Sequence, residues 1–314
     1  MSRNCVCCRT CRMWCWKAFK WLPVMLILAI IIWSYYAYVI QLCIFTIEST
    51  VQKCIYLMIH HTLLIMFCWS YVRTSIFVTT FLFQFKLPEN ELEKLLSAET
   101  EDAQRAILDN YAKELPIVTR TMSGSVRYCN RCVLVKPDRA HHCSICSRCV
   151  LKMDHHCPWV NNCVCFFNYK FFMLFLGYAL VYCIFIMATC LPYFIKFWKV
   201  YSFSSAASTG GYHIVFAFFV AMMFAISLGS LFGYHCYLVI NNRTTLESFR
   251  APMFRGGADK NGFSIGRFNN FKEVFGNSPN LWLVPVFTSF HTYMYKHNGR
   301  PPHNIIVHII LLSI

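Results

Sequence analysis

Long apolar runs alternate with polar segments along this chain of 314 residues. Four runs approach or exceed the roughly 20 residues that a helix needs to cross a bilayer. They cover residues 21–45, 55–71, 171–198 and 213–240. The apolar run 76–85 could lengthen the second of them, with Arg73 marking a membrane edge. The pattern predicts an all-α polytopic membrane protein with four transmembrane helices.

The charges that flank these runs predict their orientation. The stretch before the first run carries five basic residues and no acidic one, whereas the loops after the first and third runs have almost no Lys or Arg. The positive-inside rule then places both termini, and the segment between spans two and three, in the cytosol.

The same pattern divides the chain into six parts. Residues 86–127 form a helical linker, in which apolar residues recur at roughly helical spacing. The other parts are a basic Cys-rich N-terminus (1–20), spans 1–2 (21–85), a Cys-rich domain (128–170), spans 3–4 (171–240) and a C-terminal tail (241–314).

Composition agrees with a membrane protein. The chain is 57% hydrophobic and only 14% charged, whereas soluble domains carry about a quarter charged residues. The formal charge of +15 fits anionic cytoplasmic lipid, and we expect no nucleic-acid partner. The first apolar run is too long for a cleavable signal peptide.

The segment between spans two and three holds many of the 19 cysteines in metal-ligand spacing. Cys-x2-Cys pairs aim two thiolates at one tetrahedral zinc, and the ligands suffice for two Cys3His sites. Spacing alone does not settle the assignment. One partition gives Cys129, Cys132, His142 and Cys149 to one ion and Cys143, Cys146, His156 and Cys163 to the other.

That partition leaves Cys157 without a metal. It stands beside His155 and Asp154. A thiol becomes a nucleophile when a histidine takes its proton and a carboxylate orients that histidine. The alternative is that Cys157 is one more zinc ligand and Asp154 a helix cap or surface charge.

Residues 153–163, Met-Asp-His-His-Cys-Pro-Trp-Val-Asn-Asn-Cys, resemble the signature of the DHHC protein S-acyltransferases (palmitoyltransferases). The resemblance extends over most of the chain, including Thr244-Thr245-Leu246-Glu247 and the segment from Asn261 to Gly276. It implies two structural zinc ions, His156 as a zinc ligand, and palmitoyl-CoA as acyl donor. Cys157 would be acylated with His155 as base and Asp154 as its orienting group. The acyl group would then pass to substrate cysteines near the membrane in cytosolic or membrane proteins.

The resemblance also assigns supporting roles, each of which could instead be simple packing. Trp159, Phe172 and Phe175 match the mouth and wall of an acyl-chain cavity, and Ser34 and Tyr182 match its closed end. Thr244, Thr245, Glu247 and Asn270 match structural supports. Lys136, Arg139 and Arg148 are basic candidates for the CoA phosphates, with a solvated or lipid-facing role as the alternative.

Some positions depart from the family pattern. Cys165 and Phe167 replace the usual Gly and Ser, and a glycine there would suggest a backbone position that needs conformational freedom. An alternative function is therefore a catalytically weak, zinc-dependent membrane adaptor, with a transporter as a weaker third hypothesis. Cys5, Cys7, Cys8, Cys11 and Cys15 resemble S-acylation targets. The apolar end, residues 304–314, is too short to span a bilayer and could form an interfacial helix or be an unusual terminus. We expect the protein to reside in the membrane of the Golgi or endoplasmic reticulum or in the plasma membrane.

Overall fold

The structure is a computed structural model that describes residues 18–76, 82, 85–201, 209–287, 293–297 and 300–305. The five N-terminal cysteines lie outside the described residues. The chain divides into two compact units. One, the helical unit, contains residues 1–75, 157–161 and 171–233; the other, the Cys-rich unit, contains residues 76–156, 162–170 and 234–314.

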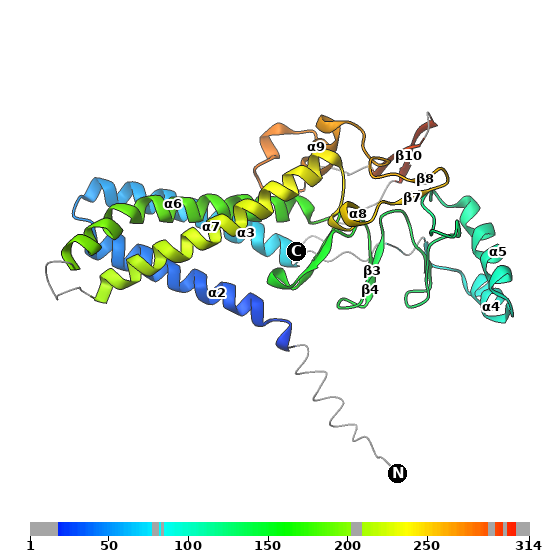
Figure 1. Ribbon diagram of the computed structural model, residues 1–314, viewed down its shortest axis with the longest axis horizontal. Coiled ribbons are helices and arrows are strands. Elements are labelled where there is room, and N and C mark those ends of the chain that lie inside the picture. Colours follow the sequence, from blue (N-terminus) through cyan, green and yellow to red (C-terminus); the bar gives the residue numbers. More distant parts are fainter. Residues whose placement is uncertain are drawn as a thin grey trace, which may run out of the picture. The chain divides into compact units, whose positions relative to one another are not determined.

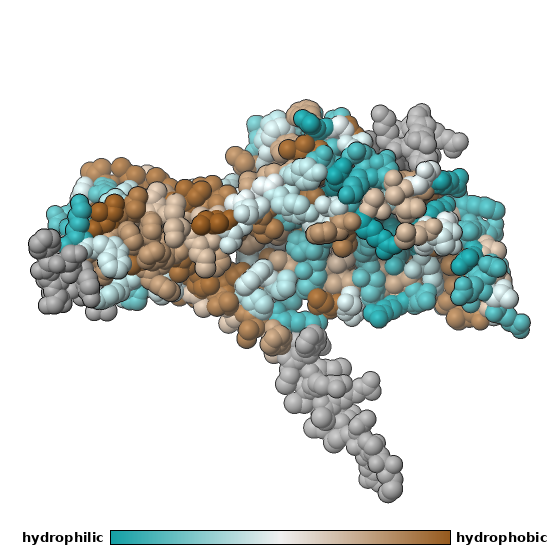
Figure 2. Space-filling view, in the orientation of Figure 1, coloured by the Kyte–Doolittle hydropathy of each residue, from teal (hydrophilic) through white to brown (hydrophobic). Residues whose placement is uncertain are grey.

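Within the described residues, four helical segments are long and apolar enough to cross a membrane, as the sequence predicted. The first is α2 (Leu22–Tyr35), which continues as the π-helix η1 (Tyr36–Thr46). The others are α3 (Thr50–Ile76), α6 (Tyr169–Tyr201) and α7 (Thr209–Asn241). Figure 1 shows these helices side by side. Apolar side chains cover much of their surface in Figure 2, as lipid-facing helices require.

The second span is longer than the apolar run 55–71 predicted, because polar residues at its ends find partners. Lys53 Nζ donates to the carbonyl of Ile44 at 3.2 Å. Arg73 lies over the ring of Phe171 at 4.9 Å, in a cation–π contact. Long basic side chains can therefore continue α3 beyond its apolar part.

Side chains from different spans interlock in the helical unit. The hydroxyl of Tyr38 in η1 donates to Thr189 Oγ1 in α6 at 3.0 Å. Phe194 of α6 stacks on Phe218 of α7 with ring centroids 4.5 Å apart. Such close aromatic and hydroxyl contacts are typical of helix association where water supplies no hydrophobic drive.

The Cys-rich unit begins with the predicted linker helices, α4 (Glu89–Ser97) and α5 (Glu101–Tyr111), followed by the 3₁₀ turn η3 (Ala112–Glu114). Thr100 caps α5, since its side chain accepts from the amide of Ala103 at 3.2 Å. Between α3 and this linker, residues 77–81 and 83–84 lie outside the described residues.

Short strands, rather than helices, form most of the Cys-rich domain (128–170), which is called the Cys-rich segment below. They are β1 (Tyr128–Cys129), β2 (Leu134–Val135), β3 (His141–Cys143), β4 (Arg148–Val150), β5 (His155–Cys157) and β6 (Asn162–Val164), and the 3₁₀ turn η4 (Pro158–Val160) joins the last two. They pair consecutively as three two-stranded sheets, β1–β2, β3–β4 and β5–β6. A two-stranded sheet is marginal by itself, so these hairpins need another source of stability.

The tail folds against this segment. Its elements are α8 (Thr245–Phe249), β7 (Met253–Phe254), β8 (Gly257–Ala258), α9 (Arg267–Phe275), η5 (Pro279–Leu281), β9 (Tyr293–His297) and β10 (Arg300–Ile305). Phe263 joins a buried cluster with Val135 and Phe166 of the Cys-rich segment. Asn304 and Ile305 pair with β9 as strand residues, so the apolar end does not begin as the interfacial helix considered above; residues 306–314 lie outside the described part.

Candidate active site and metal centres

Cys129, Cys132, His142 and Cys149 form one candidate metal centre. Their ligand atoms all lie within 4.8 Å of one another. His142 Nδ1 is 3.6, 3.2 and 3.9 Å from the sulfurs of Cys129, Cys132 and Cys149. Zinc with bonds of about 2.3 Å to sulfur and 2.0 Å to nitrogen would place a tetrahedral S–N pair about 3.5 Å apart. The four donors therefore fit a zinc ion.

Cys143, Cys146, His156 and Cys163 form a second centre of the same kind. His156 Nδ1 is 3.8, 3.4 and 3.7 Å from the sulfurs of Cys143, Cys146 and Cys163. The two groups contain the same residues as the partition considered from the sequence. Both clusters could bind zinc, which would supply the stability that the short hairpins lack.

The local fold explains why these residues converge. In the β3–β4 hairpin, His142 lies directly opposite Cys149. The pairs Cys129–Cys132 and Cys143–Cys146 each make a tight turn, and the residue after the second cysteine has a left-handed backbone: φ is 51° at Val133 and 54° at Ser147. A β-branched residue such as valine rarely adopts this conformation, so the turn at Val133 is strained and persists because the surrounding structure holds it.

Asp154 and His155 form a hydrogen-bonded pair at the start of β5. The Nδ1–H of His155 donates to Asp154 Oδ2 at 2.6 Å. Asp154 is 1% exposed, whereas the side chain of His155 is 31% exposed. With Nδ1 carrying the proton, Nε2 is the nitrogen that can accept another. The pair therefore has the geometry of a histidine base held by a carboxylate.

Thr245 fixes the other side of that carboxylate. Its amide donates to Asp154 Oδ1 and its hydroxyl donates to Oδ2, both at 2.8 Å. Burial by itself would raise the pKa of Asp154, but the hydrogen bonds and charges around it, His155 foremost, lower the pKa below its usual value. Asp154 therefore stays ionised and keeps the imidazole oriented.

A capping box explains why Thr245 is available. The side chain of Thr244 accepts from the amide of Glu247 at 3.1 Å, and Glu247 Oε2 accepts from the amide of Thr244 at 2.9 Å. These bonds start α8 and leave the amide of Thr245, in the first turn, to donate outside the helix.

Cys157 ends β5 and is buried, with 6% of its surface exposed. It belongs to neither Cys3His group. It is grouped with the helical unit, as is the following segment through Asn161. The carbonyl of Trp159 in this segment accepts from the hydroxyl of Tyr71, at 2.8 Å, near the end of α3.

Sequence reasoning missed two residues beside the Asp154–His155 pair. His235 of α7 is buried, and its ring lies 5.9 Å from that of His155. Its Nδ1 is 2.9 Å from the hydroxyl of Tyr169. A histidine at the end of an apolar span was the available signal, because such residues are costly in membranes.

Arg139 is corrected by the structure. Its guanidinium donates to both carboxylate oxygens of Glu247 at 2.7 Å, and to Asn242 Oδ1 and carbonyl at 2.8 and 2.9 Å. The arginine side chain is 2% exposed. A phosphate of CoA cannot compete for a guanidinium committed inside the unit, so we do not propose Arg139 as a CoA contact.

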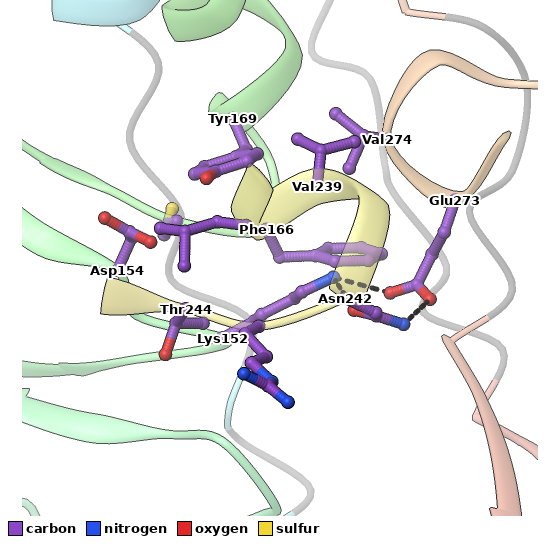
Figure 3. A pocket seen from close by; sticks show the side chains of 12 residues that line it. Lys152, Asp154, Phe166, Tyr169, Val239, Asn242, Thr244, Glu273 and Val274 are labelled. Carbon is purple, nitrogen blue, oxygen red and sulfur yellow. Dashed lines mark hydrogen bonds and ion pairs between the residues drawn. The ribbon is translucent and has the colours of Figure 1, made fainter. Parts of the chain in front are cut away.

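A second ion pair, whose side chains are 11% and 10% exposed, lies beside the first. Lys152 Nζ is 2.6 Å from Glu273 Oε1 and 3.0 Å from Asn242 Oδ1. Figure 3 shows these three side chains, with Asp154, lining one pocket. The pocket measures about 20 Å³, room for about one water molecule. The pocket is therefore too small for a substrate, and the residues that line it have a structural role.

The remaining predicted residues fall as follows. Asn270 donates from Nδ2 to the carbonyl of Ile240 at 2.7 Å, at the end of α7. Lys136 and Arg148 are each half-buried. Of the expected cavity residues, Phe172, Phe175 and Tyr182 are buried, Ser34 is half-buried and Trp159 is 50% exposed.

Neither Cys165 nor Phe167 adopts a positive φ. The amide of Cys165 donates to Asn168 Oδ1 at 2.8 Å, and Phe167 is buried in the core of the Cys-rich unit. The larger side chains at these two positions are therefore accommodated without a left-handed backbone.

Membrane acyltransferases of the DHHC class are the proteins whose sequences match this chain. Residues 123–251 match the family model "DHHC palmitoyltransferase". The chain is 54% identical over 277 residues to palmitoyltransferase ZDHHC2 of Danio rerio, covering 88% of this chain and 76% of that one. It is 52% identical over 285 residues to ZDHHC2 of Homo sapiens, covering 88% and 74%. It is 49% identical over 277 residues to ZDHHC15 of Xenopus laevis, covering 88% and 81%. The chain belongs to the DHHC palmitoyltransferase family.

Proposed function

We propose that this protein transfers a long-chain acyl group, such as palmitoyl, from CoA to cysteines of protein substrates through an acyl-Cys157 intermediate. The observation that carries this proposal is the Asp154–His155 pair at 2.6 Å, two residues before a cysteine outside both metal clusters. His155 and Cys157 are alternate residues of β5, and alternate residues of a strand project from the same face.

The first step forms the thioester on the enzyme. His155 accepts the thiol proton of Cys157, and the thiolate attacks the carbonyl carbon of the acyl-CoA. The carbon–sulfur bond to CoA breaks, and the proton passes from His155 to the departing CoA sulfur. Asp154 stabilises the imidazolium that exists between these two events.

The second step repeats this chemistry with a substrate cysteine. Its proton moves to His155, its sulfur attacks the acyl carbonyl on Cys157, and the Cys157 thiolate is released and reprotonated. One thioester replaces another, so little driving force is needed. Positioning and exclusion of water are the enzyme's main contributions.

The other groups support these steps. The two Cys3His clusters hold structural zinc ions, Thr245 positions Asp154, and Asn270 anchors the tail to the end of α7. Phe172, Phe175 and Trp159 contact the acyl chain, whose far end reaches Ser34 and Tyr182. Lys136 and Arg148 are the basic candidates for the CoA phosphates. Both termini and the Cys-rich unit face the cytosol, on a Golgi, endoplasmic reticulum or plasma membrane, where substrate cysteines near the bilayer are accessible.

Incubation of the purified protein with labelled palmitoyl-CoA tests the proposal. Wild type should acquire a hydroxylamine-sensitive label, and Cys157→Ser should acquire none. Cys165→Ser is the matched control, because Cys165 is also buried and also outside both metal clusters. Equal labelling of wild type and Cys157→Ser would overturn the mechanism.

A further inference from the structure

His60 lies within α3 and is completely buried. An ionisable side chain inside a membrane span is costly and usually marks a function. The acyl-transfer chemistry proposed above does not use it. Its contacts show what it holds in place.

His60 connects three spans through hydrogen bonds and ring contacts. Its Nε2 lies 3.0 Å from the hydroxyl of Tyr182 in α6. That hydroxyl lies 3.4 Å from Ser34 Oγ in α2. The ring of His60 stacks on Tyr38 of η1, with centroids 4.6 Å apart and planes 6° apart. We call His60, Tyr182, Ser34, Tyr38 and Thr189, the hydrogen-bond acceptor of the Tyr38 hydroxyl, the polar layer.

The two nitrogens of His60 differ in their surroundings, and the contacts with Tyr182 and Tyr38 account for the ring orientation. His60 Nδ1 is buried and has no hydrogen-bond partner among the described residues. The next residue, His61, instead turns its Nδ1 to the carbonyl of Leu57 at 2.7 Å. An unsatisfied buried polar atom destabilises a protein, so an orientation that leaves one is maintained by the contacts on the other side of the ring.

A series of aromatic contacts runs from the segment that carries Cys157 to the polar layer. Tyr71 contacts the carbonyl of Trp159 and lies 5.4 Å from Phe175 between ring centroids. Phe67 stacks on Phe175 at 5.8 Å and on Tyr182 at 5.9 Å. This aromatic series ends at the hydroxyl of Tyr182, which belongs to the polar layer.

The length of this series suits a fatty acyl chain. His60 and Tyr71 are both in α3, and their separation in the sequence corresponds to about 16 Å of helix. An alkyl chain attached to Cys157 and lying along these rings would reach the polar layer with its terminal carbons.

We propose that His60 determines acyl-chain length by holding the polar layer together as a stop. This inference rests on the acyl transfer proposed above. His60 is a positioning residue that acts through Tyr182. A longer chain would have to separate the hydroxyl of Tyr182 from His60 and Ser34, and hydrocarbon offers these groups no replacement partner. The stop is therefore energetic as well as steric.

A competition experiment measures this effect. Full-length protein in detergent is given equal amounts of myristoyl-, palmitoyl-, stearoyl- and arachidoyl-CoA, and intact mass reports which acyl group reaches Cys157. His60→Leu should raise the stearoyl-to-palmitoyl ratio roughly fivefold, as loss of one buried hydrogen bond predicts. His60→Gln, whose amide can occupy the place of Nε2, should keep the wild-type ratio. His61→Leu is the matched control and should also keep it.

A second variant keeps the test informative if His60→Leu is poorly folded. Tyr182→Phe removes only the hydroxyl and should shift the ratio in the same direction. The double variant should shift it no further, because both changes remove one interaction. Additive shifts, or an unchanged ratio in both single variants, would overturn the inference. Failure of acyl transfer itself is distinguishable, since wild type would then show no adduct with any donor.

Discussion

The helical unit and the Cys-rich unit keep their folds by different means. The spans present apolar surface to lipid and interlock through rings and hydroxyls, as Tyr38–Thr189 and Phe194–Phe218 show. The Cys-rich unit has strands of two or three residues between Tyr128 and Val164. It has eight candidate metal ligands, the buried Arg139–Glu247 ion pair and the partly buried Lys152–Glu273 ion pair. A unit held by many weak contacts tolerates the loss of any one of them. A unit held by a few strong interactions is destabilised by the loss of a single one.

Removal of metal should give the largest difference between the responses of the two units. Structural zinc in small domains contributes about 10–16 kcal/mol of apparent binding free energy. A strong chelator, or Cys146→Ser, should therefore expose the hairpins to protease and abolish autoacylation, while the spans stay helical by circular dichroism. Cys165→Ser should resist protease as wild type does. Hairpins that remain protected after complete loss of zinc would show that this unit does not depend on metal.

The buried Arg139–Glu247 pair should give the next largest effect. Glu247→Gln leaves the arginine buried without its counter-charge, which typically costs about 3–5 kcal/mol. We expect a large drop in the thermal midpoint of the purified protein. Arg139→Met combined with Glu247→Gln should be milder than either single change, because no unpaired charge remains. Simple additivity would contradict a coupled pair.

Thr245 tests positioning without loss of the fold. Thr245→Val removes the hydroxyl bond to the Asp154 carboxylate and keeps the amide bond. A bond to a charged group is worth about 1.5–3 kcal/mol, so autoacylation should slow about tenfold or more. Thr245→Ser keeps the hydroxyl and should retain most of the rate. Single-turnover kinetics at saturating palmitoyl-CoA would show both, and equal rates for Val and Ser would exclude this role.

The smallest effect is expected in the spans. Phe194→Leu loses one aromatic pair, worth about 0.5–1.5 kcal/mol, and keeps an apolar side chain. Thermal stability and autoacylation should change little. A loss comparable to that of Glu247→Gln would mean that the spans are as sensitive to single changes as the Cys-rich unit.

The same contrast explains what the sequence could reveal. The spans can be predicted from the sequence because a bilayer requires a minimum length of apolar residues. The two metal-ligand sets can be predicted because the Cys-x2-Cys spacing is local in the sequence. The sequence did not predict that Arg139 pairs with Glu247 or that His235 approaches His155. The partners in each pair are distant in the sequence. Arg139 meets Glu247 only after the tail has folded, and His155 meets His235 only when α7 is in place. Hence Arg139 looked like a surface group suited to CoA.

The shared strand β3 has a consequence for assembly. His142 serves one cluster and the adjacent Cys143 serves the other. Neighbouring residues of a strand point to opposite faces, so one hairpin is anchored from both sides. A metal ion bound in either cluster would order the strand that also carries a ligand of the other cluster. A newly made chain should thus mature in an all-or-none manner, and half-loaded protein should be scarce at every zinc supply.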